Sequence, residues 1–262
     1  MFRLTVLIEN FSYCGLPCEH GLSLYLEYRG RVWLLDTGTS GAFAANADAL
    51  GLDLERVEGV VLSHGHDDHA GGLPAFFARN RRAKVYARPF AREEYRRDTA
   101  DPEKRPAGVD PALFSAWADR FDLSDGPRTL APGLHLLPDT VPHEQSLVAE
   151  TAEGLVVLNS CCHAGAGEIV AGVLERFPGQ RVAALVGGFH LVGPYGMGSL
   201  GRDPEEVRAL ARRLAGPLGV KAVHTGHCTG LPAFSLLEEA APGHFFRLTT
   251  GTVLEWEDPW PV

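Results

Sequence analysis

The sequence lacks an uninterrupted apolar run of the roughly 18 residues that a membrane-spanning helix needs. Its first residues read as a strand that Glu9 and Asn10 interrupt, without the longer apolar run and the small-residue cleavage site of a signal peptide. These absences argue against membrane insertion and against secretion, so we expect a cytoplasmic protein.

Cysteine and basic residues are also scarce. The five cysteines are an odd number and two of them, Cys161 and Cys162, are adjacent, which is a poor disulfide framework and fits a reducing compartment. The 24 Lys and Arg residues are outnumbered by 33 Asp and Glu residues, giving a net charge of −9. This balance argues against a nucleic-acid-binding surface but is compatible with an anionic small molecule held by a metal ion.

The rest of the composition is that of a globular protein, since 45% of the 262 residues are apolar and 22% are charged. Short β-rich runs alternate with helical patterns, which predicts a layered α/β fold. Strands are predicted at residues 3–8, 22–28, 31–35, 59–62, 84–87, 133–137, 146–150, 155–158, 181–186, 221–224 and 246–249. Helices are predicted at residues 40–50, 71–79, 167–176, 203–214 and 231–240.

Residues 88–128 differ from the rest of the chain because they combine many charges with prolines and aromatic residues. We predict a helical insertion here, which is either a surface excursion of the main domain or a lid over a site.

The strongest chemical signal is the stretch SHGHDDHAGG at residues 63–72, which follows a predicted strand and precedes a predicted helix. Imidazole is a ligand suited to zinc and iron, and aspartate supplies a harder oxygen. In an extended loop, alternation places His64 and His66 on one side, whereas Asp68 and His69 can turn toward a second ion. The stretch therefore predicts a metal site.

Further polar residues stand at the ends of other predicted strands, each within two residues of a glycine: Asp36, His163, His190 and His227. In layered α/β folds, functional sites form where strand ends converge. Several histidines placed in this way indicate one metal centre assembled from distant parts of the chain.

The chain resembles the metallo-β-lactamase superfamily. The resemblance is carried by the HxHxDH pattern of His64–His69, the upstream Asp36-Thr-Gly and the late Thr-Gly-His227. Within that superfamily it is similar to the archaeal branch of ribofuranosylaminobenzene 5′-phosphate (dihydropterin) synthase-like enzymes. Features of that branch are the segments EHGLS at 19–23, CCHAG at 161–165, GGFHL at 187–191 and TGHCTG at 225–230.

The resemblance implies an αββα sandwich, formed by the whole chain as a single domain, with a one- or two-metal site at one edge. His64 and His66 would bind the first ion, with His163 in place of a missing imidazole; Asp68, His69 and His227 would bind the second. The usual bridging aspartate falls near Cys161, which would bridge, bind one ion or only pack. We favour weak or absent bridging, because a small Ser-Cys-Cys turn is explained by packing.

On this interpretation Asp68 orients a metal-activated hydroxide and Asp36 accepts a hydrogen bond from a ligating imidazole. His190 and His20 are candidates for contact with the substrate or its leaving group.

The function expected is metal-dependent hydrolysis of an ester or phosphoester of a small molecule, with zinc as the preferred metal and manganese or iron also compatible. A transferase that forms a pterin–arylamine bond and a di-iron redox protein are the alternatives. We expect neither a nucleic acid nor a membrane as partner, and the oligomeric state stays open.

Overall fold

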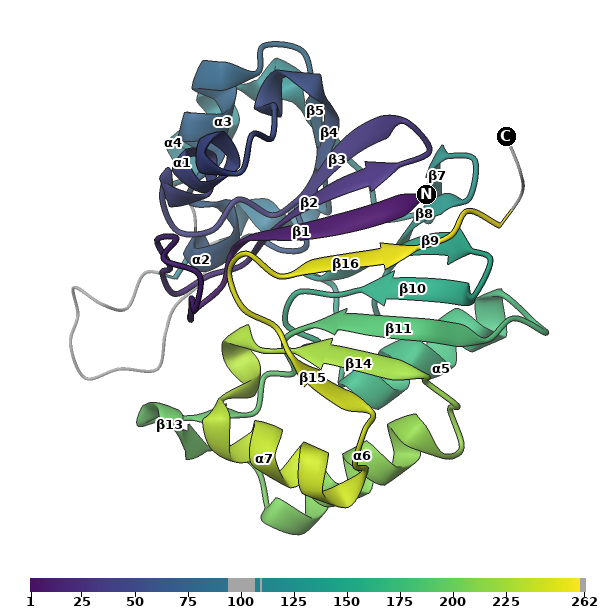
Figure 1. Ribbon diagram of the computed structural model, residues 1–262. Coiled ribbons are helices and arrows are strands. Elements are labelled where there is room, and N and C mark those ends of the chain that lie inside the picture. Colours follow the sequence, from purple (N-terminus) through teal and green to yellow (C-terminus); the bar gives the residue numbers. More distant parts are fainter. Residues whose placement is uncertain (94–106, 109, 260–262) are drawn as a thin grey trace. The chain divides into compact units, whose positions relative to one another are not determined.

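The computed structural model describes residues 1–93, 107–108 and 110–259, and its contacts divide the chain into two compact units (Figure 1). Unit 1 comprises residues 1–126 and 249–255, and unit 2 comprises residues 127–248 with the chain from residue 256 onward. Each unit contains a seven-stranded mixed sheet and helices. The predicted alternation of strands and helices is confirmed in both.

The sheet of unit 1 is antiparallel from β1 to β3 and parallel from β3 to β6. Its strands are, from edge to edge, β16 (Val253–Trp256), β1 (Phe2–Ile8), β2 (Ser23–Tyr28), β3 (Arg31–Leu35), β4 (Val57–Val61), β5 (Lys84–Ala87) and β6 (Phe121–Leu123). The α-helices described in this unit are α1 (Ala42–Ala49), α2 (Asp67–Ala70), α3 (Leu73–Arg79) and α4 (Pro111–Ala116). Phe43 and Phe76, both fully buried, contribute to the core between helices and sheet.

The sheet of unit 2 is antiparallel from β7 to β10 and parallel from β10 to β15. Its strands are, from edge to edge, β15 (Phe245–Arg247), β14 (Ala222–Thr225), β11 (Val182–Gly187), β10 (Gly154–Leu158), β9 (Gln145–Thr151), β8 (Leu134–Pro138) and β7 (Arg128–Ala131). A separate hairpin joins β12 (Val192–Gly193) to β13 (Gly196–Leu200), and the α-helices described are α5 (Ala166–Arg176), α6 (Pro204–Ala215) and α7 (Leu231–Ala240).

The helix predicted at residues 203–214 is confirmed with its predicted start. The Asp203 carboxylate accepts a hydrogen bond from the backbone N–H of Glu205 at 2.8 Å, Pro204 occupies the first turn, and Arg212 and Arg213 lie in the last turn. This distribution satisfies the helix end and matches the helix dipole. Among the described residues, no helix has the length and apolar character that crossing a bilayer requires.

The parallel strands determine where the polar loops gather. Neighbouring parallel strands end at the same edge of a sheet, so the loops that follow them lie together. In unit 1, Leu35 of β3 pairs with Val61 of β4. In unit 2, Leu158 of β10 pairs with Val186 of β11, and the next residue of β11, Gly187, pairs with Thr225 of β14. The loops just beyond these pairs contain the residues that are predicted from the sequence for the metal site.

Up to Gly126, the described part of the predicted insertion belongs to unit 1, whereas Pro127 and Arg128 belong to unit 2. Trp117 stacks on Phe77 of α3, with ring centroids 5.0 Å apart, and the ring of Phe114 lies 4.6 Å from that of Phe121 in β6. These aromatic residues therefore pack into the core of the unit. Residues 94–106 and 109, including Tyr95, lie outside the described residues, and the lid stays a prediction.

His224 on β14 links the stability of unit 2 to pH. Its ring stacks on Phe246 at 5.2 Å, and burial lowers its pKa from 6.5 to about 4. Below pH 6.5 the unfolded chain therefore binds a proton that the folded chain does not. The parent therefore loses stability as the pH falls from 7 to 4, and His224→Phe should not show this loss. As the pH is lowered over this range, we expect the free energy of unfolding of the variant to increase relative to that of the parent by about 1–2 kcal/mol, allowing for partial exposure. Urea unfolding at several pH values measures this, and a pH-independent difference would contradict it.

Candidate metal centre

The histidine-rich loop of unit 1 connects β4 to α2, as the sequence predicts. His64 and His69 are fully buried, Asp68 is nearly so, and His66 is partly exposed. The rings of His64 and His69 lie 4.3 Å apart, and those of His64 and His66 lie 4.4 Å apart. Three imidazoles thus form one compact group, in a region where burying polar side chains has a cost unless they are hydrogen-bonded.

Asp36 supplies those hydrogen bonds. It follows β3 directly, is fully buried and has a φ of 58°, a left-handed conformation that is unfavourable for a side chain other than glycine. Its Oδ1 accepts the backbone N–H of Ser63 at 2.7 Å, and its Oδ2 accepts the Ser63 hydroxyl at 2.6 Å. The same Oδ2 lies 2.8 Å from Nδ1 of His69.

These contacts determine the tautomers of two histidines. An ionised carboxylate only accepts, so His69 donates from Nδ1 to Asp36, and in its neutral form Nε2 keeps a lone pair. The Ser63 hydroxyl donates its one proton to Asp36; it therefore accepts from Nδ1 of His64, 2.8 Å away. The Nε2 atoms of His64 and His69 are consequently both in the form that binds a cation.

His66 completes the group in unit 1. Its Nδ1 lies 2.9 Å from Nε2 of His64. Because Nε2 of His64 carries a lone pair, Nδ1 of His66 donates a hydrogen bond to it in the metal-free protein. A cation that binds both nitrogens would replace this proton. This is the behaviour expected of a pair of metal ligands.

His20 fixes the orientation of Asp68. Asn10 accepts the backbone N–H of Gly21 through Oδ1, which turns its amide nitrogen toward Nδ1 of His20 at 3.3 Å. His20 therefore accepts at Nδ1 and donates from Nε2 to Oδ2 of Asp68, 3.1 Å away. That oxygen lies 3.6 Å from Nε2 of His69. Glycine is required at position 21, where a Cβ would approach the Asp68 carbonyl oxygen to 2.5 Å.

A second buried carboxylate organises unit 2. Glu144, which precedes β9, is fully buried. Its Oε1 accepts the backbone N–H of Cys161 at 3.1 Å, and its Oε2 accepts the backbone N–H of His163 at 2.6 Å. Oε2 also lies 3.2 Å from Nδ1 of His163. Glu144 therefore holds the loop after β10, and its carboxylate lies beside the imidazole of His163.

Two further histidines stand beside His163. The ring of His190, after β11, lies 4.5 Å from that of His163, and the ring of His143 lies 4.8 Å from that of His163. His163 and His190 line a cavity of about 260 Å³, which also includes the side chain of Arg202. The hydrogen bond with Cys228 raises the pKa of His190 above its ordinary value, and this outweighs the lowering effect of burial.

The loop after β14 adds His227 and Cys228. One ligand atom each of Cys161, His227 and Cys228 lie within 4.8 Å of one another. Burial alone would raise the pKa of Cys228, but hydrogen bonding with Cys161, the charge of His227 and the contact with His190 together hold that pKa well below its ordinary value. By contrast, burial raises the pKa of the neighbouring Cys162 thiol.

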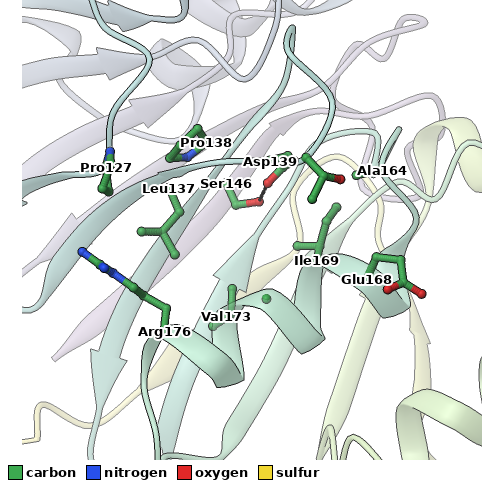
Figure 2. Close-up of a pocket in the computed structure, with 12 residues that line it drawn as sticks. Pro127, Leu137, Pro138, Asp139, Ser146, Ala164, Glu168, Ile169, Val173 and Arg176 are labelled. Atoms are coloured by element: carbon green, nitrogen blue, oxygen red, sulfur yellow. Dashed lines mark hydrogen bonds between the residues drawn. The ribbon is translucent and has the colours of Figure 1, made fainter.

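Another cavity of unit 2, of about 250 Å³, lies along α5 (Figure 2). Its polar lining includes Ser146 and Asp139, joined by a hydrogen bond of 2.7 Å, and also Glu168 and Arg176. Asp139 also accepts a hydrogen bond from the amide of Asn159 at 2.6 Å, and Asn159 in turn accepts the backbone N–H of Cys162. This network supports the same loop that Glu144 holds.

The structure thus gathers the predicted residues into one set in each unit. The set of unit 1 contains His20, Asp36, His64, His66, Asp68 and His69. The set of unit 2 contains Cys161, His163, His190 and His227. Sequence reasoning missed Glu144, although an acidic residue directly before a buried strand is a usable signal, and it assigned no role to Cys228.

The family described as the metallo-β-lactamase superfamily matches residues 16–227, which include both sets of residues. The chain belongs to the metallo-β-lactamase superfamily. The predicted fold class is thereby confirmed.

Two relatives match nearly the whole chain. A protein of Methanocaldococcus jannaschii named 7,8-dihydropterin-6-methyl-4-(β-D-ribofuranosyl)-aminobenzene-5′-phosphate synthase is 26% identical, over 97% of this chain and 96% of its own length. The crystal structure of Tm1679, described as a metal-dependent hydrolase of the β-lactamase superfamily, is 28% identical with a TM-score of 0.80, over 98% of this chain and 100% of its own. A diphosphatase of the PhnP family shares the fold, with 16% identity and a TM-score of 0.60 over 98% of both chains.

The residues present fit the divalent metal ions that this superfamily typically binds. The decisive observation is the hydrogen-bond network of Asp36 in unit 1, from which Nε2 of His64 and of His69 are inferred to be acceptors. Metal-binding histidines usually donate their other ring N–H to a carboxylate or a similar acceptor, which increases their basicity. Imidazole and carboxylate together suit zinc, and also manganese and iron.

Asp36 is therefore expected to control metal affinity without binding the metal. In Asp36→Asn the amide cannot accept hydrogen bonds at both positions, so His69 and Ser63 lose their fixed orientation. We expect the dissociation constant for Zn²⁺ to rise about 10- to 100-fold, measured by competition with a chromophoric chelator. Asp48→Asn, which removes an exposed ion pair with Arg79, is the matched control. Equal affinities in the two variants would show that the Asp36 contacts do not prepare the site.

Proposed function

We propose that this chain is a metal-dependent hydrolase of an ester or phosphoester bond in a small molecule. The proposed metal ligands are His64, His66, Asp68, His69, His163 and His227. Zinc is the proposed metal, with one or two ions per chain, because imidazole ligands dominate the set.

The observation that carries the proposal is the hydrogen-bond network of Asp36. The buried Asp36 carboxylate accepts hydrogen bonds from Ser63 and from His69, and through the Ser63 hydroxyl it also orients His64. Hydrogen bonds of this kind orient the histidine rings so that their other nitrogens can bind a cation. In unit 2, Glu144 accepts the backbone N–H of His163, and its Oε2 lies 3.2 Å from Nδ1 of that ring.

The mechanism assigns distinct roles to residues of this chain. Divalent ions held by these residues would supply an activated hydroxide near neutral pH and would stabilise charge on the attacked and leaving oxygens. Asp68, held by the Nε2–H of His20, orients the attacking oxygen and is the proposed acceptor of its proton. His190, beside His163, is proposed to donate a proton to the leaving group.

A transferase is the second candidate, and a specific observation favours it. The relative from Methanocaldococcus jannaschii that aligns along 96% of its length is named a synthase. The same metal-ligand sets would then activate an arylamine–pterin condensation in place of attack by water. The hydrolase is preferred because Tm1679, at 28% identity, is described as a metal-dependent hydrolase.

Metal content and turnover test the proposal together. We expect His66→Ala and His163→Ala each to retain less zinc than the parent by elemental analysis, because each removes a ligand. His135→Gln, a change at a histidine that bonds Glu150, should leave zinc content unchanged. The zinc-loaded parent should hydrolyse bis(p-nitrophenyl) phosphate or p-nitrophenyl acetate, and Asp68→Asn should reduce kcat by about 100-fold.

The fate of solvent oxygen separates the two candidate reactions. In ¹⁸O-labelled water, hydrolysis places one labelled atom in the product, whereas condensation with 4-(β-D-ribofuranosyl)aminobenzene 5′-phosphate places none in the coupled product.

Unchanged zinc content in His66→Ala and His163→Ala would contradict the ligand assignment. Equal turnover by metal-free and zinc-loaded protein would contradict the proposed function.

A further inference from the structure

Two thiols lie side by side at the end of the parallel strands of unit 2. The Sγ atoms of Cys161 and Cys228 are 3.4 Å apart, although 67 residues separate them in the sequence. Together with a ring nitrogen of His227, they form a group of three ligand atoms that all lie within 4.8 Å of one another. A group of this composition is one that zinc favours in proteins.

The position of Cys161 is fixed by its backbone. Its N–H donates to Oε1 of the buried Glu144 at 3.1 Å, and only 3% of the residue is exposed. The next residue, Cys162, has a φ of 50°, so the chain turns sharply here in a conformation that is unfavourable for a side chain. Its own side chain packs in the apolar core of unit 2, in contrast to that of Cys161.

The position of Cys228 is fixed by the loop after β11. The backbone N–H of His190 donates to its Sγ at 3.2 Å, and both His190 and His227 have positive φ values, of 51° and 45°. Gly188 leaves the space that the sulfur needs, because a Cβ there would lie 2.5 Å from Sγ. Two histidines with unfavourable backbone conformations and one glycine therefore fix the position of the Cys228 sulfur atom.

Packing alone does not explain this arrangement. A small buried residue could fill the same volume without two left-handed histidines and an obligatory glycine around it. Strain of this kind persists where the surrounding structure holds a functional group in place, and here the group it holds is a pair of thiols next to an imidazole.

We propose that Cys161 and Cys228 bind, as two thiolates, the metal ion that His227 binds. The two S–H protons are released to solvent as the two metal–sulfur bonds form. The inference rests on the proposed function only in that a divalent metal is bound by this chain. It revises the expectation that Cys161 merely packs, and it adds Cys228, which the sequence pattern did not single out.

The ligand set has a consequence for metal choice. Thiolate is a soft ligand that favours zinc, whereas manganese and magnesium favour oxygen ligands. The ion bound by Cys161, His227 and Cys228 is therefore zinc. Removing both sulfurs should reduce the preference for Zn²⁺ over Mn²⁺ by roughly tenfold or more. This magnitude follows because loss of even an outer partner of a metal ligand lowers metal affinity about 10- to 100-fold.

Cobalt substitution tests the proposal by spectroscopy and without an activity assay. The metal-free protein, kept reduced, is titrated with Co²⁺, whose thiolate complexes show a charge-transfer absorption in the near ultraviolet. All variants carry Cys14→Ser and Cys18→Ser, so that the two exposed thiols cannot contribute. We expect the charge-transfer band in this parent, about half its intensity in Cys161→Ser and in Cys228→Ser, and none in the double variant. Cys162→Ser is the matched control and should retain the full band.

Two results would overturn the inference, and they differ in what they say of the proposed function. Cobalt d–d bands without a charge-transfer band in the parent would show metal bound without sulfur, which leaves the proposed function intact. The absence of any bound cobalt would overturn both.

A measurement on the unaltered chain guards against variants that fail to fold. Zn²⁺ should protect Cys228, which is partly exposed, from alkylation by iodoacetamide, read by mass spectrometry, while the exposed Cys14 and Cys18 continue to react. Equal labelling of Cys228 with and without Zn²⁺ would contradict the proposal.

Discussion

The hydrogen bonds received by the buried carboxylate of Asp36 determine the arrangement of the histidine cluster in unit 1. A buried charge is unfavourable unless hydrogen bonds compensate it, and Asp36 receives three, from the N–H and hydroxyl of Ser63 and from His69. Because the carboxylate can only accept, each partner must donate. The proton positions on His64 and His69 follow from that requirement, and the cation-binding nitrogens follow from the proton positions.

Unit 2 reaches a similar result by a different route. Glu144 is also fully buried, but it accepts two backbone N–H groups of one loop, those of Cys161 and His163, in addition to its contact with the His163 ring. It therefore holds the loop itself, whereas Asp36 mainly orients side chains. Both carboxylates stand next to strands of a rigid sheet, which is the support that a preorganised metal ligand needs.

The sequence predicts those parts of the fold and site that depend on local pattern. His64, His66, Asp68 and His69 lie within six residues, so their chemistry is visible without any tertiary structure. The continuous apolar runs that become β10 and β11 are equally visible, because central parallel strands are buried on both faces. The start of α6 is visible because Asp203 and Pro204 act within one turn.

The rest depends on contacts between distant residues. β16 pairs with β1 from the opposite end of the sequence, and β6 is only three residues long, so neither leaves a periodic signal. Glu144 and Cys228 acquire their roles from Cys161, which lies 17 and 67 residues away along the chain. The positive φ values of Asp36, His190 and His227 are similarly set by the loops around them.

The protonation of the histidines in the metal-free protein tests the central claim most directly. Nitrogen-15 NMR of labelled imidazoles distinguishes a protonated Nδ1 from a protonated Nε2. The account predicts that, above the pKa of each ring, His64 and His69 are found with the proton on Nδ1, and that His20 is found with the proton on Nε2. A proton on Nε2 of His69 would contradict it, because the Asp36 carboxylate would then not be what prepares this ring to bind a metal ion.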